Sequence, residues 1–225
     1  MDKTNKMSRM FSFITKTWNP LGGECKNNCS YCWAKKLIER YNMKKYEGPA
    51  KLYRKELTKK FRKDDFVFVQ DMSDLFGQWV PTWIINEVIK FMRDSPATFL
   101  LLTKNPRRYI EDSGLEKLSK NVVCGATIET DFFNEDKLTF MDVLGHPRKM
   151  VSVEPIMNFN LVKFSMYLAA IKPEFVAIGY DNYNNGLNEP KLEETKRLIY
   201  LLEEVGIKVY RKTLREPIPQ IALAK

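Results

Sequence analysis

Residues 66–102 read FVFVQDMSDLFGQWVPTWIINEVIKFMRDSPATFLLL, and this stretch indicates the fold. Residues 66–70 and 99–102 are short runs of aromatic and aliphatic side chains, which predict buried strands. Between them, residues 81–93 carry apolar side chains at helical spacing, and Pro81 suits the first turn of a helix. A buried strand, a helix and a second buried strand form the unit that joins neighbouring strands of a parallel sheet.

The same alternation repeats along the chain. We expect further strands at 12–17, 122–128, 150–153, 175–178 and 207–210, and further helices at 33–46, 51–63, 106–119, 132–144, 161–171 and 190–205. Seven strands that alternate with helices predict a parallel sheet covered by helices, in a single α/β domain over residues 1–225. We interpret this domain as a partial (β/α)6-7 barrel, TIM-like but smaller than the eight-unit form. A doubly wound open sheet fits the periodicity nearly as well.

Composition excludes several classes of protein. The chain has 225 residues, of which 44% are hydrophobic, and these are enough for one sizeable core. It contains no apolar run long enough to span a bilayer, so we expect no membrane partner. The N-terminus has no hydrophobic export segment, and four cysteines are too few for a disulfide scaffold. We therefore expect a cytoplasmic protein.

Positive charge is concentrated in one segment. Residues 35–63 contain twelve lysines and arginines against three glutamates, which accounts for the whole net charge of +9. Such a local field favours a polyanion, so this basic helical segment predicts a nucleic acid as partner. Two solvated lysine-rich helices, or a surface that docks a partner protein, explain the same pattern.

Three cysteines lie close together in the loop at residues 18–33. Cys25, Cys29 and Cys32 have the spacing C-x3-C-x2-C, whereas Cys124 lies in a predicted apolar strand. Three thiolates can hold three irons of a [4Fe–4S] cluster and leave the fourth iron open to a small molecule. Zinc is the alternative, because thiolates suit both metals, but it would need a fourth ligand. His146, the single histidine, is distant in sequence.

This cysteine spacing, with the aromatic Tyr31 before the last cysteine, resembles the signature of the radical S-adenosylmethionine (radical SAM) superfamily. Further blocks at 17–20 (TWNP), 72–76 (MSDLF), 102–104 (LTK), 125–129 (GATIE) and 152–155 (SVEP) resemble an uncharacterised radical-SAM-like family of phage and prokaryotic genomes. Two positions depart from that family, and its first two cysteines are often further apart than Cys25 and Cys29. Glu24 precedes the first cysteine where the family usually has glycine, and GYDNY at 179–183 replaces a Gly-Gly-Glu-like turn.

The resemblance implies a cofactor and a reaction. Cys25, Cys29 and Cys32 would bind a [4Fe–4S] cluster, and the amino and carboxylate groups of SAM would bind the open iron. An electron from a reductase or ferredoxin-like donor would then cleave SAM to methionine and a 5′-deoxyadenosyl radical, which abstracts hydrogen from a substrate. Such chemistry is oxygen-sensitive. Tyr31 would shield the cluster and present backbone groups to adenine.

Polar side chains follow the predicted strands at their carboxyl ends, where parallel α/β folds place their sites. They are Asp71, Ser73 and Asp74, then Thr103 and Lys104, then Thr127 and Glu129, and finally Ser152 and Glu154. In a barrel these residues would converge on one rim. The resemblance implies that the loop at 71–74 holds the amino group of SAM, although at least one of its polar residues is expected only to cap a turn.

Other rim roles stay open at this point. Lys104 is expected to pair with the SAM carboxylate and Glu129 to accept hydrogen bonds from ribose, or the two are expected to pair with each other. Glu154 is placed to contact SAM or substrate. The loop at 180–188 suits a planar substrate as well as it suits a turn-rich connection. Arg211, Lys212 and Arg215 are expected to be solvated cations.

The sequence leaves the substrate unidentified. The basic segment behind the cysteine loop favours a nucleic acid or a nucleobase-like compound. A peptide or small metabolite is an alternative, with the basic residues docking a reductase. A further alternative is a non-catalytic nucleic-acid-binding module that is stabilised by zinc or by a cluster.

Overall fold

Seven parallel strands form one sheet in the computed structural model, which describes residues 11–111, 118–132 and 148–218. They are β1 (Lys16–Trp18), β4 (Phe66–Val69), β5 (Thr98–Thr103), β6 (Val122–Thr127), β7 (Lys149–Val153), β8 (Phe175–Ile178) and β9 (Lys208–Arg211). Each strand pairs with the next in this order, so the sheet winds in one direction and has no switch point of the doubly wound kind. No pairing joins β1 to β9 within the described ranges, and the sheet is open.

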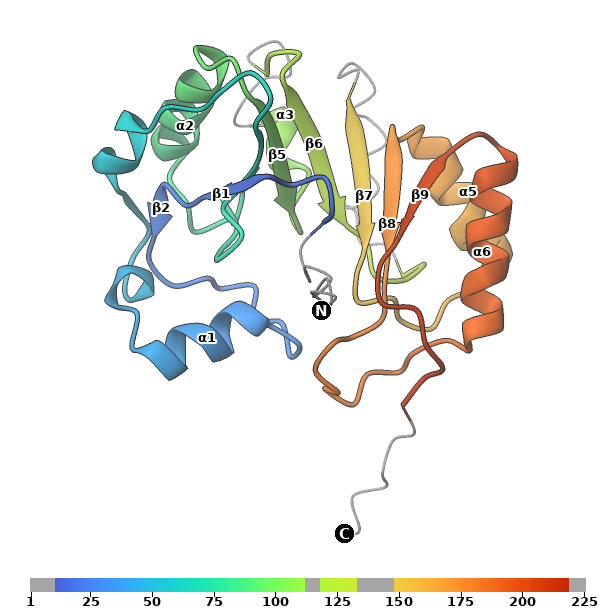
Figure 1. Ribbon diagram of the computed structural model, residues 1–225. Helices are drawn as coiled ribbons and strands as arrows, with labels where there is room; N and C mark the ends of the chain where they lie inside the picture. Colours follow the sequence, from blue (N-terminus) through green and yellow to red (C-terminus); the bar gives the residue numbers. More distant parts are fainter. Residues whose placement is uncertain (1–10, 112–117, 133–147, 219–225) are drawn as a thin grey trace, which may run out of the picture.

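Helices cover one face of the sheet (Figure 1). They are α2 (Thr82–Arg93), α5 (Leu161–Ile171), α6 (Leu192–Glu204) and the short α3 (Arg108–Glu111). The helices predicted at 81–93, 161–171 and 190–205 are therefore confirmed within one or two residues. Of the helix predicted at 106–119, the structure describes four helical residues, and most of the helix predicted at 132–144 lies outside the described ranges.

The first strand is shorter than predicted. Residues 12–17 were expected to be extended, but β1 spans only Lys16–Trp18, and Phe11 and Ile14 are joined by a turn in which the Ile14 N–H donates to the Phe11 carbonyl. Phe11 and Phe13 leave the strand register because their rings pack on the sheet face. The aromatic residues of this segment are therefore buried against the sheet face, although the segment before Lys16 does not pair as a strand of the sheet.

The basic segment contains one α-helix and not two: the helix predicted at 33–46 is confirmed over Trp33–Tyr41, and the helix predicted at 51–63 was wrong. α1 (Trp33–Tyr41) ends at Asn42, which adopts the left-handed conformation with φ of 48°. The short 3-10 helices η1 (Lys44–Tyr46) and η2 (Arg54–Thr58) flank β3 (Lys51–Leu52), which pairs with β2 (Leu21–Gly22). This pairing ties the segment to the cysteine loop, and tertiary contacts override the helical spacing of its side chains.

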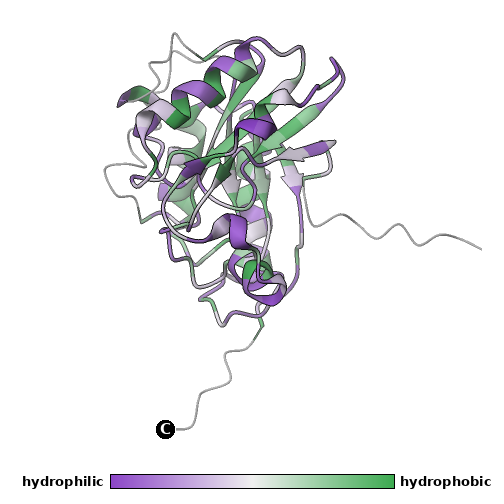
Figure 2. Ribbon diagram, turned by 90° about the vertical axis from the view of Figure 1, so that its left-hand side faces the viewer, coloured by the Kyte–Doolittle hydropathy of each residue, from purple (hydrophilic) through white to green (hydrophobic). Residues whose placement is uncertain are grey.

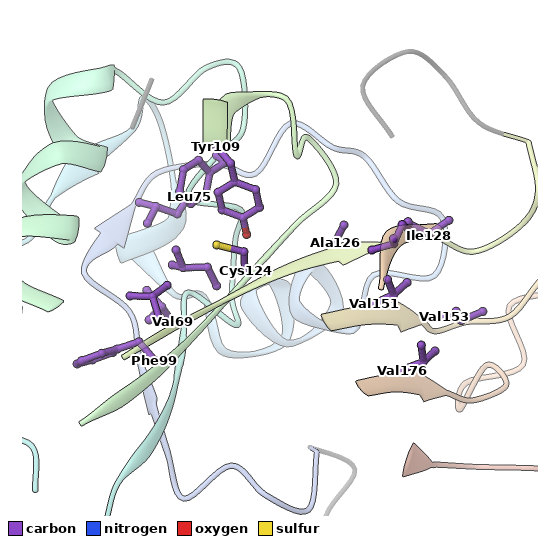
Figure 3. Packing of buried hydrophobic residues seen from close by; sticks show 14 of the residues in the cluster. Val69, Leu75, Phe99, Tyr109, Cys124, Ala126, Ile128, Val151, Val153 and Val176 are labelled. Carbon is purple, nitrogen blue, oxygen red and sulfur yellow. The ribbon is translucent and has the colours of Figure 1, made fainter. Parts of the chain in front are cut away.

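A large hydrophobic core lies between the sheet and its helices (Figure 3). Cys124 is fully buried there among Val69, Phe99 and Tyr109, and the Tyr109 hydroxyl donates to the Gly125 carbonyl at 2.9 Å. Burial in apolar surroundings raises the pKa of the Cys124 thiol. Cys124 is therefore a core residue, as the sequence predicted. Figure 2 shows hydrophobic strands at the centre and helices along which hydrophilic and hydrophobic residues alternate.

The opposite face of the sheet is covered by aromatic side chains from the N-terminal segment. The Phe13 ring lies 5.2 Å from that of Phe66, 5.0 Å from that of Phe175 and 4.9 Å from that of Tyr210, measured between centroids. Phe11 stacks on Phe13 at 5.4 Å. This aromatic cluster fills the sheet face between the two edges and leaves the carboxyl ends of the strands uncovered.

None of the described helices combines the length and the apolar character needed to cross a membrane.

Candidate functional site

A cavity of about 400 Å³ opens at the carboxyl ends of the strands. The polar residues predicted to converge on the rim line it: Asp71, Ser73, Asp74, Thr103, Lys104, Thr127, Ser152 and Glu154. Cys25, Cys29, Tyr31 and Cys32 of the cysteine loop line the same cavity. Glu129 joins them through hydrogen bonds to Tyr31 and Lys104. The predicted convergence on one rim is confirmed, because parallel strands bring their carboxyl ends to one edge of the sheet.

Close backbone contacts hold the start of the cysteine loop. Gln70, at the end of β4, accepts a hydrogen bond from the Leu21 N–H at 3.0 Å and donates to the Leu21 carbonyl at 3.1 Å. Gly23 has φ of 95°, and a Cβ there would lie 2.4 Å from the Pro49 carbonyl oxygen. Only glycine fits this position, so the loop is tied both to the sheet and to the segment before β3.

The three cysteine thiols face the cavity from the loop and from the start of α1. Cys32 caps α1: its Sγ accepts a hydrogen bond from the Lys35 N–H at 3.3 Å, and its own N–H donates to the Cys29 carbonyl at 3.1 Å. This contact places the Cys32 sulfur at the first turn of the helix, on the cavity side of the loop. Burial raises the pKa of Cys25 and Cys29, although Lys104 partly opposes this at Cys29. Metal binding to these two thiols must therefore displace protons.

The donor set fits a cluster. Cys25 and Cys29 interact electrostatically, as do Cys29 and Cys32, so the thiols are near neighbours on one cavity. Among the described residues, no three His, Cys, Asp or Glu side chains are gathered to chelate a single metal ion. A cluster does not require such chelation, because each thiolate binds a different iron.

A buried polar atom lies beside the first cysteine. The Ser73 hydroxyl oxygen is buried and makes no hydrogen bond of normal geometry within the described part of the chain. It lies next to Cys25 and lowers the pKa of that thiol. A buried hydroxyl whose only neighbour is a thiol, a weak hydrogen-bonding group, gains free energy when a ligand accepts its hydrogen bond. Ser73 is therefore suited to contact a group bound in the cavity.

Asp74 is a structural residue. Its Oδ2 accepts hydrogen bonds from Asn27 Nδ2 at 2.9 Å and from the Lys104 N–H at 3.0 Å, and its Oδ1 accepts from the Phe76 N–H at 3.0 Å. These contacts join the cysteine loop, the end of β5 and the turn after β4. Asp74 is the member of the 71–74 run that caps a turn, as expected for at least one of the three residues, and its role in binding SAM stays a prediction.

Asp71 has a different environment. Its Oδ1 accepts a hydrogen bond from Asn19 Nδ2 at 2.6 Å, and the side chain lines the cavity. Burial raises its pKa, while the Asn19 hydrogen bond and nearby Lys45 partly oppose the shift. The carboxylate thus lies in a site that favours a cationic partner.

Lys104, Glu129 and Tyr31 form one network. Lys104 follows β5 and Glu129 follows the neighbouring β6, so the two meet as an ion pair whose side chains are 23% and 7% exposed. The Tyr31 hydroxyl donates to Glu129, and Lys104 donates to Tyr31. Burial and the Glu129 charge raise the pKa of Tyr31, which stays protonated. The pairing of Lys104 with Glu129, one of two sequence expectations, is confirmed.

A second polar group forms the opposite wall of the cavity. Lys212 Nζ donates to Glu154 Oε2 at 2.6 Å, with side-chain exposures of 14% and 17%. The Asn182 amide also interacts with Glu154 and accepts a hydrogen bond from Thr213 Oγ1 at 2.6 Å. Burial raises the pKa of Glu154 and Lys212 opposes this. Lys212 Nζ lies 4.5 Å above the Phe11 ring.

The expectation of solvated cations after β9 was wrong for two of three residues. Lys212 is held in the cavity wall, and Arg215 pairs with Glu189 at 2.7 Å and lies over the Tyr180 ring. Arg211 is half-exposed and pairs with Glu203. Lys212 directly follows β9, so its position at a strand end could have identified it as a cavity residue, as it did for Lys104.

The remaining predicted rim residues are buried at the ends of their strands. Thr103 is buried and its Oγ1 accepts a hydrogen bond from the Asn105 N–H at 2.9 Å, which caps the turn after β5. Thr127 and Ser152 are buried at the ends of β6 and β7 and contribute polar wall to the cavity. Phe11, which also lines the cavity, was missed because no strand or motif marks it in the sequence.

Comparison with known proteins adds a family match and no activity. The model of the family described as "Protein of unknown function (DUF5131)" matches residues 9–179, about three quarters of the chain. The matched range includes all three loop cysteines and every predicted rim residue. The search of curated proteins found no match.

Proposed function

The chain belongs to the DUF5131 family, and we propose that it is a radical SAM enzyme that binds a [4Fe–4S] cluster through Cys25, Cys29 and Cys32. The observation that carries the proposal is that these three thiols line the same cavity as the polar residues at the carboxyl ends of β4 to β7. We interpret the singly wound, open sheet as a partial TIM-like barrel whose rim holds this cavity.

Each part of the cavity has a role in this proposal. When bound, a reduced cluster supplies the electron that splits the sulfonium C–S bond of SAM and yields methionine and a 5′-deoxyadenosyl radical. Cys32 presents its sulfur at the start of α1, and Ser73 offers a hydroxyl beside Cys25. Phe11 and the aromatic cluster behind it close the inner end of the cavity and exclude water from that side.

The rim residues orient SAM. Asp71 would accept hydrogen bonds from the amino group, because its partly buried carboxylate gains from a cationic neighbour. The Lys104–Glu129 pair fixes Tyr31 at the cavity, and the same two side chains would contact the carboxylate and ribose of SAM when it is bound. Thr127 and Ser152 complete the polar wall. The cysteines are only partly buried, so an electron donor such as a reductase or ferredoxin-like protein can approach, and we place the reaction in the cytoplasm.

Asp71→Asn tests the proposed SAM site. In the cluster-loaded chain, the affinity for SAM should fall by about 1.5–3 kcal/mol, because a charge-assisted hydrogen bond to the amino group is lost. The native fold should become more stable at pH 7. The raised pKa means that the Asp71 charge lowers the free energy of unfolding above the folded-state pKa. That gain should shrink as the pH falls toward about 4, where the unfolded-state carboxyl is half protonated.

Isothermal titration calorimetry measures the affinity and urea unfolding measures the stability. Asp64→Asn removes an exposed carboxylate and should change neither. A variant that is more stable but binds SAM as tightly as the native chain would show that Asp71 is not a SAM ligand. Loss of both stability and affinity would assign Asp71 a structural role.

A further inference from the structure

One face of α1 forms one side of the cavity mouth. Trp33, Lys36 and Arg40 are three and four residues apart, so they share a helix face, and we call them the α1 stripe. Trp33 lines the cavity and is 36% exposed. Lys36 Nζ donates to Asn185 Oδ1 at 2.6 Å and lies 5.6 Å from the centre of the Tyr183 ring. The α1 stripe therefore reaches the loop after β8 across the mouth.

The loop after β8 presents an aromatic ring in a fixed position. Asp181 is buried, and its Oδ1 accepts a hydrogen bond from the Tyr183 N–H at 3.1 Å. The same carboxylate accepts from Asn185 Nδ2 at 2.8 Å. Tyr183 lines the cavity and is 40% exposed. Two exposed aromatic side chains, Trp33 and Tyr183, thus border the mouth from different elements with a lysine between them.

The basic segment is divided in the structure, and only part of it borders the mouth. Ion pairs engage several of its cations, namely Lys44 with Glu47, Lys45 and Lys59 with Glu56, and Arg54 with Glu87. Lys60 and Lys63 lie between η2 and β4, on the approach to the amino end of β4, and neither lines the cavity at the carboxyl ends of the strands. The exposed Lys36 and Arg40 of the α1 stripe are the cations closest in the chain to the cysteine loop on that helix face.

The inner wall of the cavity can read a planar polar ring. Glu154 and Asn182 carry acceptor and donor groups, and Lys212 holds the carboxylate in place. Phe11 lies beneath this group and offers an apolar surface. A nucleobase has both an aromatic face and hydrogen-bonding edges, and these edges are free only when the base is unpaired.

We propose that the substrate of this site is a single-stranded nucleic acid, with one unpaired base entering between Trp33 and Tyr183 and the adjoining phosphates contacting Lys36 and Arg40. The reaction on this substrate rests on the proposed function, whereas the binding of the single strand does not. Aromatic stacking and a positively charged track are the two means by which proteins hold single strands without a duplex.

Fluorescence anisotropy of labelled single-stranded oligonucleotides, RNA and DNA of about twelve nucleotides, tests the binding. The cluster-loaded full chain is used without SAM. Removing two phosphate contacts in Lys36→Gln/Arg40→Gln should lower the affinity by about tenfold at low salt. It should also reduce the slope of log affinity against log salt by about 1.4. The matched pair Lys60→Gln/Lys63→Gln removes the same charge from residues that do not line the cavity and should leave both values unchanged.

The aromatic residues should behave differently. Trp33→Ala and Tyr183→Ala should each lower the affinity by about 5- to 150-fold, the range for loss of one stacked base, without changing the salt slope. Iron and sulfide content verifies that each variant remains loaded and folded.

Several results would overturn the proposal. One is failure to bind either oligonucleotide at low salt, and another is equal affinity for a duplex of the same sequence. A third is a loss of affinity in Lys60→Gln/Lys63→Gln that equals the loss in Lys36→Gln/Arg40→Gln. Unchanged oligonucleotide affinity in the Lys36 and Arg40 pair, with slower reduction by a ferredoxin-like donor, would assign the α1 stripe to a protein partner. SAM is absent from the binding assay. Its results can therefore be interpreted even if the chain does not cleave SAM.

Discussion

Replacement of Cys25, Cys29 or Cys32 with alanine should abolish cluster binding. Anaerobically reconstituted chain should hold about four iron and four sulfide per molecule, and each single variant should hold almost none. The reason is that a cluster bound by only two protein thiolates has two exposed irons and is lost to chelators and to solvent. Iron and sulfide assays, with the visible absorption of the cluster, measure the loss.

Cys124→Ala is the matched control. Its thiol is fully buried in the core behind the sheet and does not line the cavity (Figure 3). The variant should load iron and sulfide like the native chain. Stoichiometric zinc without sulfide in chain prepared and reconstituted without oxygen would contradict the cluster, and so would equal loss of iron in all four variants.

Lys104→Met should lower the free energy of unfolding by about 3 kcal/mol. The substitution leaves the nearly buried Glu129 carboxylate without its cation, and removal of one partner from a buried ion pair is costly. It also removes the link from β5 to Tyr31, which precedes Cys32 in the cysteine loop. Urea unfolding of the metal-free, reduced chain measures the change.

A double substitution distinguishes the effect of the unpaired charge from the effect of altered packing. In Lys104→Met/Glu129→Gln the unpaired charge is gone, so much of the lost stability should return. Arg211→Met breaks an exposed ion pair with Glu203 and should cost less than about 1 kcal/mol. Strictly additive effects of Lys104→Met and Glu129→Gln would show that the two side chains are not coupled.

The periodicity of the sequence predicted the sheet because buried parallel strands leave a signal within a few residues. Residues 66–70, 99–102 and 175–178 are continuous apolar runs, and each lies in or next to a strand of the structure. The convergence of the rim followed from topology alone, because polar residues at the carboxyl ends of neighbouring parallel strands must meet. Lys104 and Glu129 are one example.

The parts that the sequence did not predict depend on contacts between distant residues. Residues 51–63 have the composition of a helix, but β3 pairs with β2 instead. Leu57 reaches the core from the short 3-10 helix η2, and Phe61 reaches it from the irregular chain that follows. Phe11 lines the cavity because it packs across the sheet onto Phe68. The local sequence pattern predicts neither arrangement, because both depend on contacts with residues that are distant in the sequence.

The measurement that most directly tests the account is the fate of SAM in the reconstituted chain. Anaerobic, cluster-loaded protein with a chemical reductant should convert SAM to 5′-deoxyadenosine and methionine in equal amounts, as separated by liquid chromatography. The Cys29→Ala variant should form neither product. A chain that holds about four iron and four sulfide, yet neither binds SAM nor forms 5′-deoxyadenosine, would contradict the proposed enzyme while leaving its cluster in place.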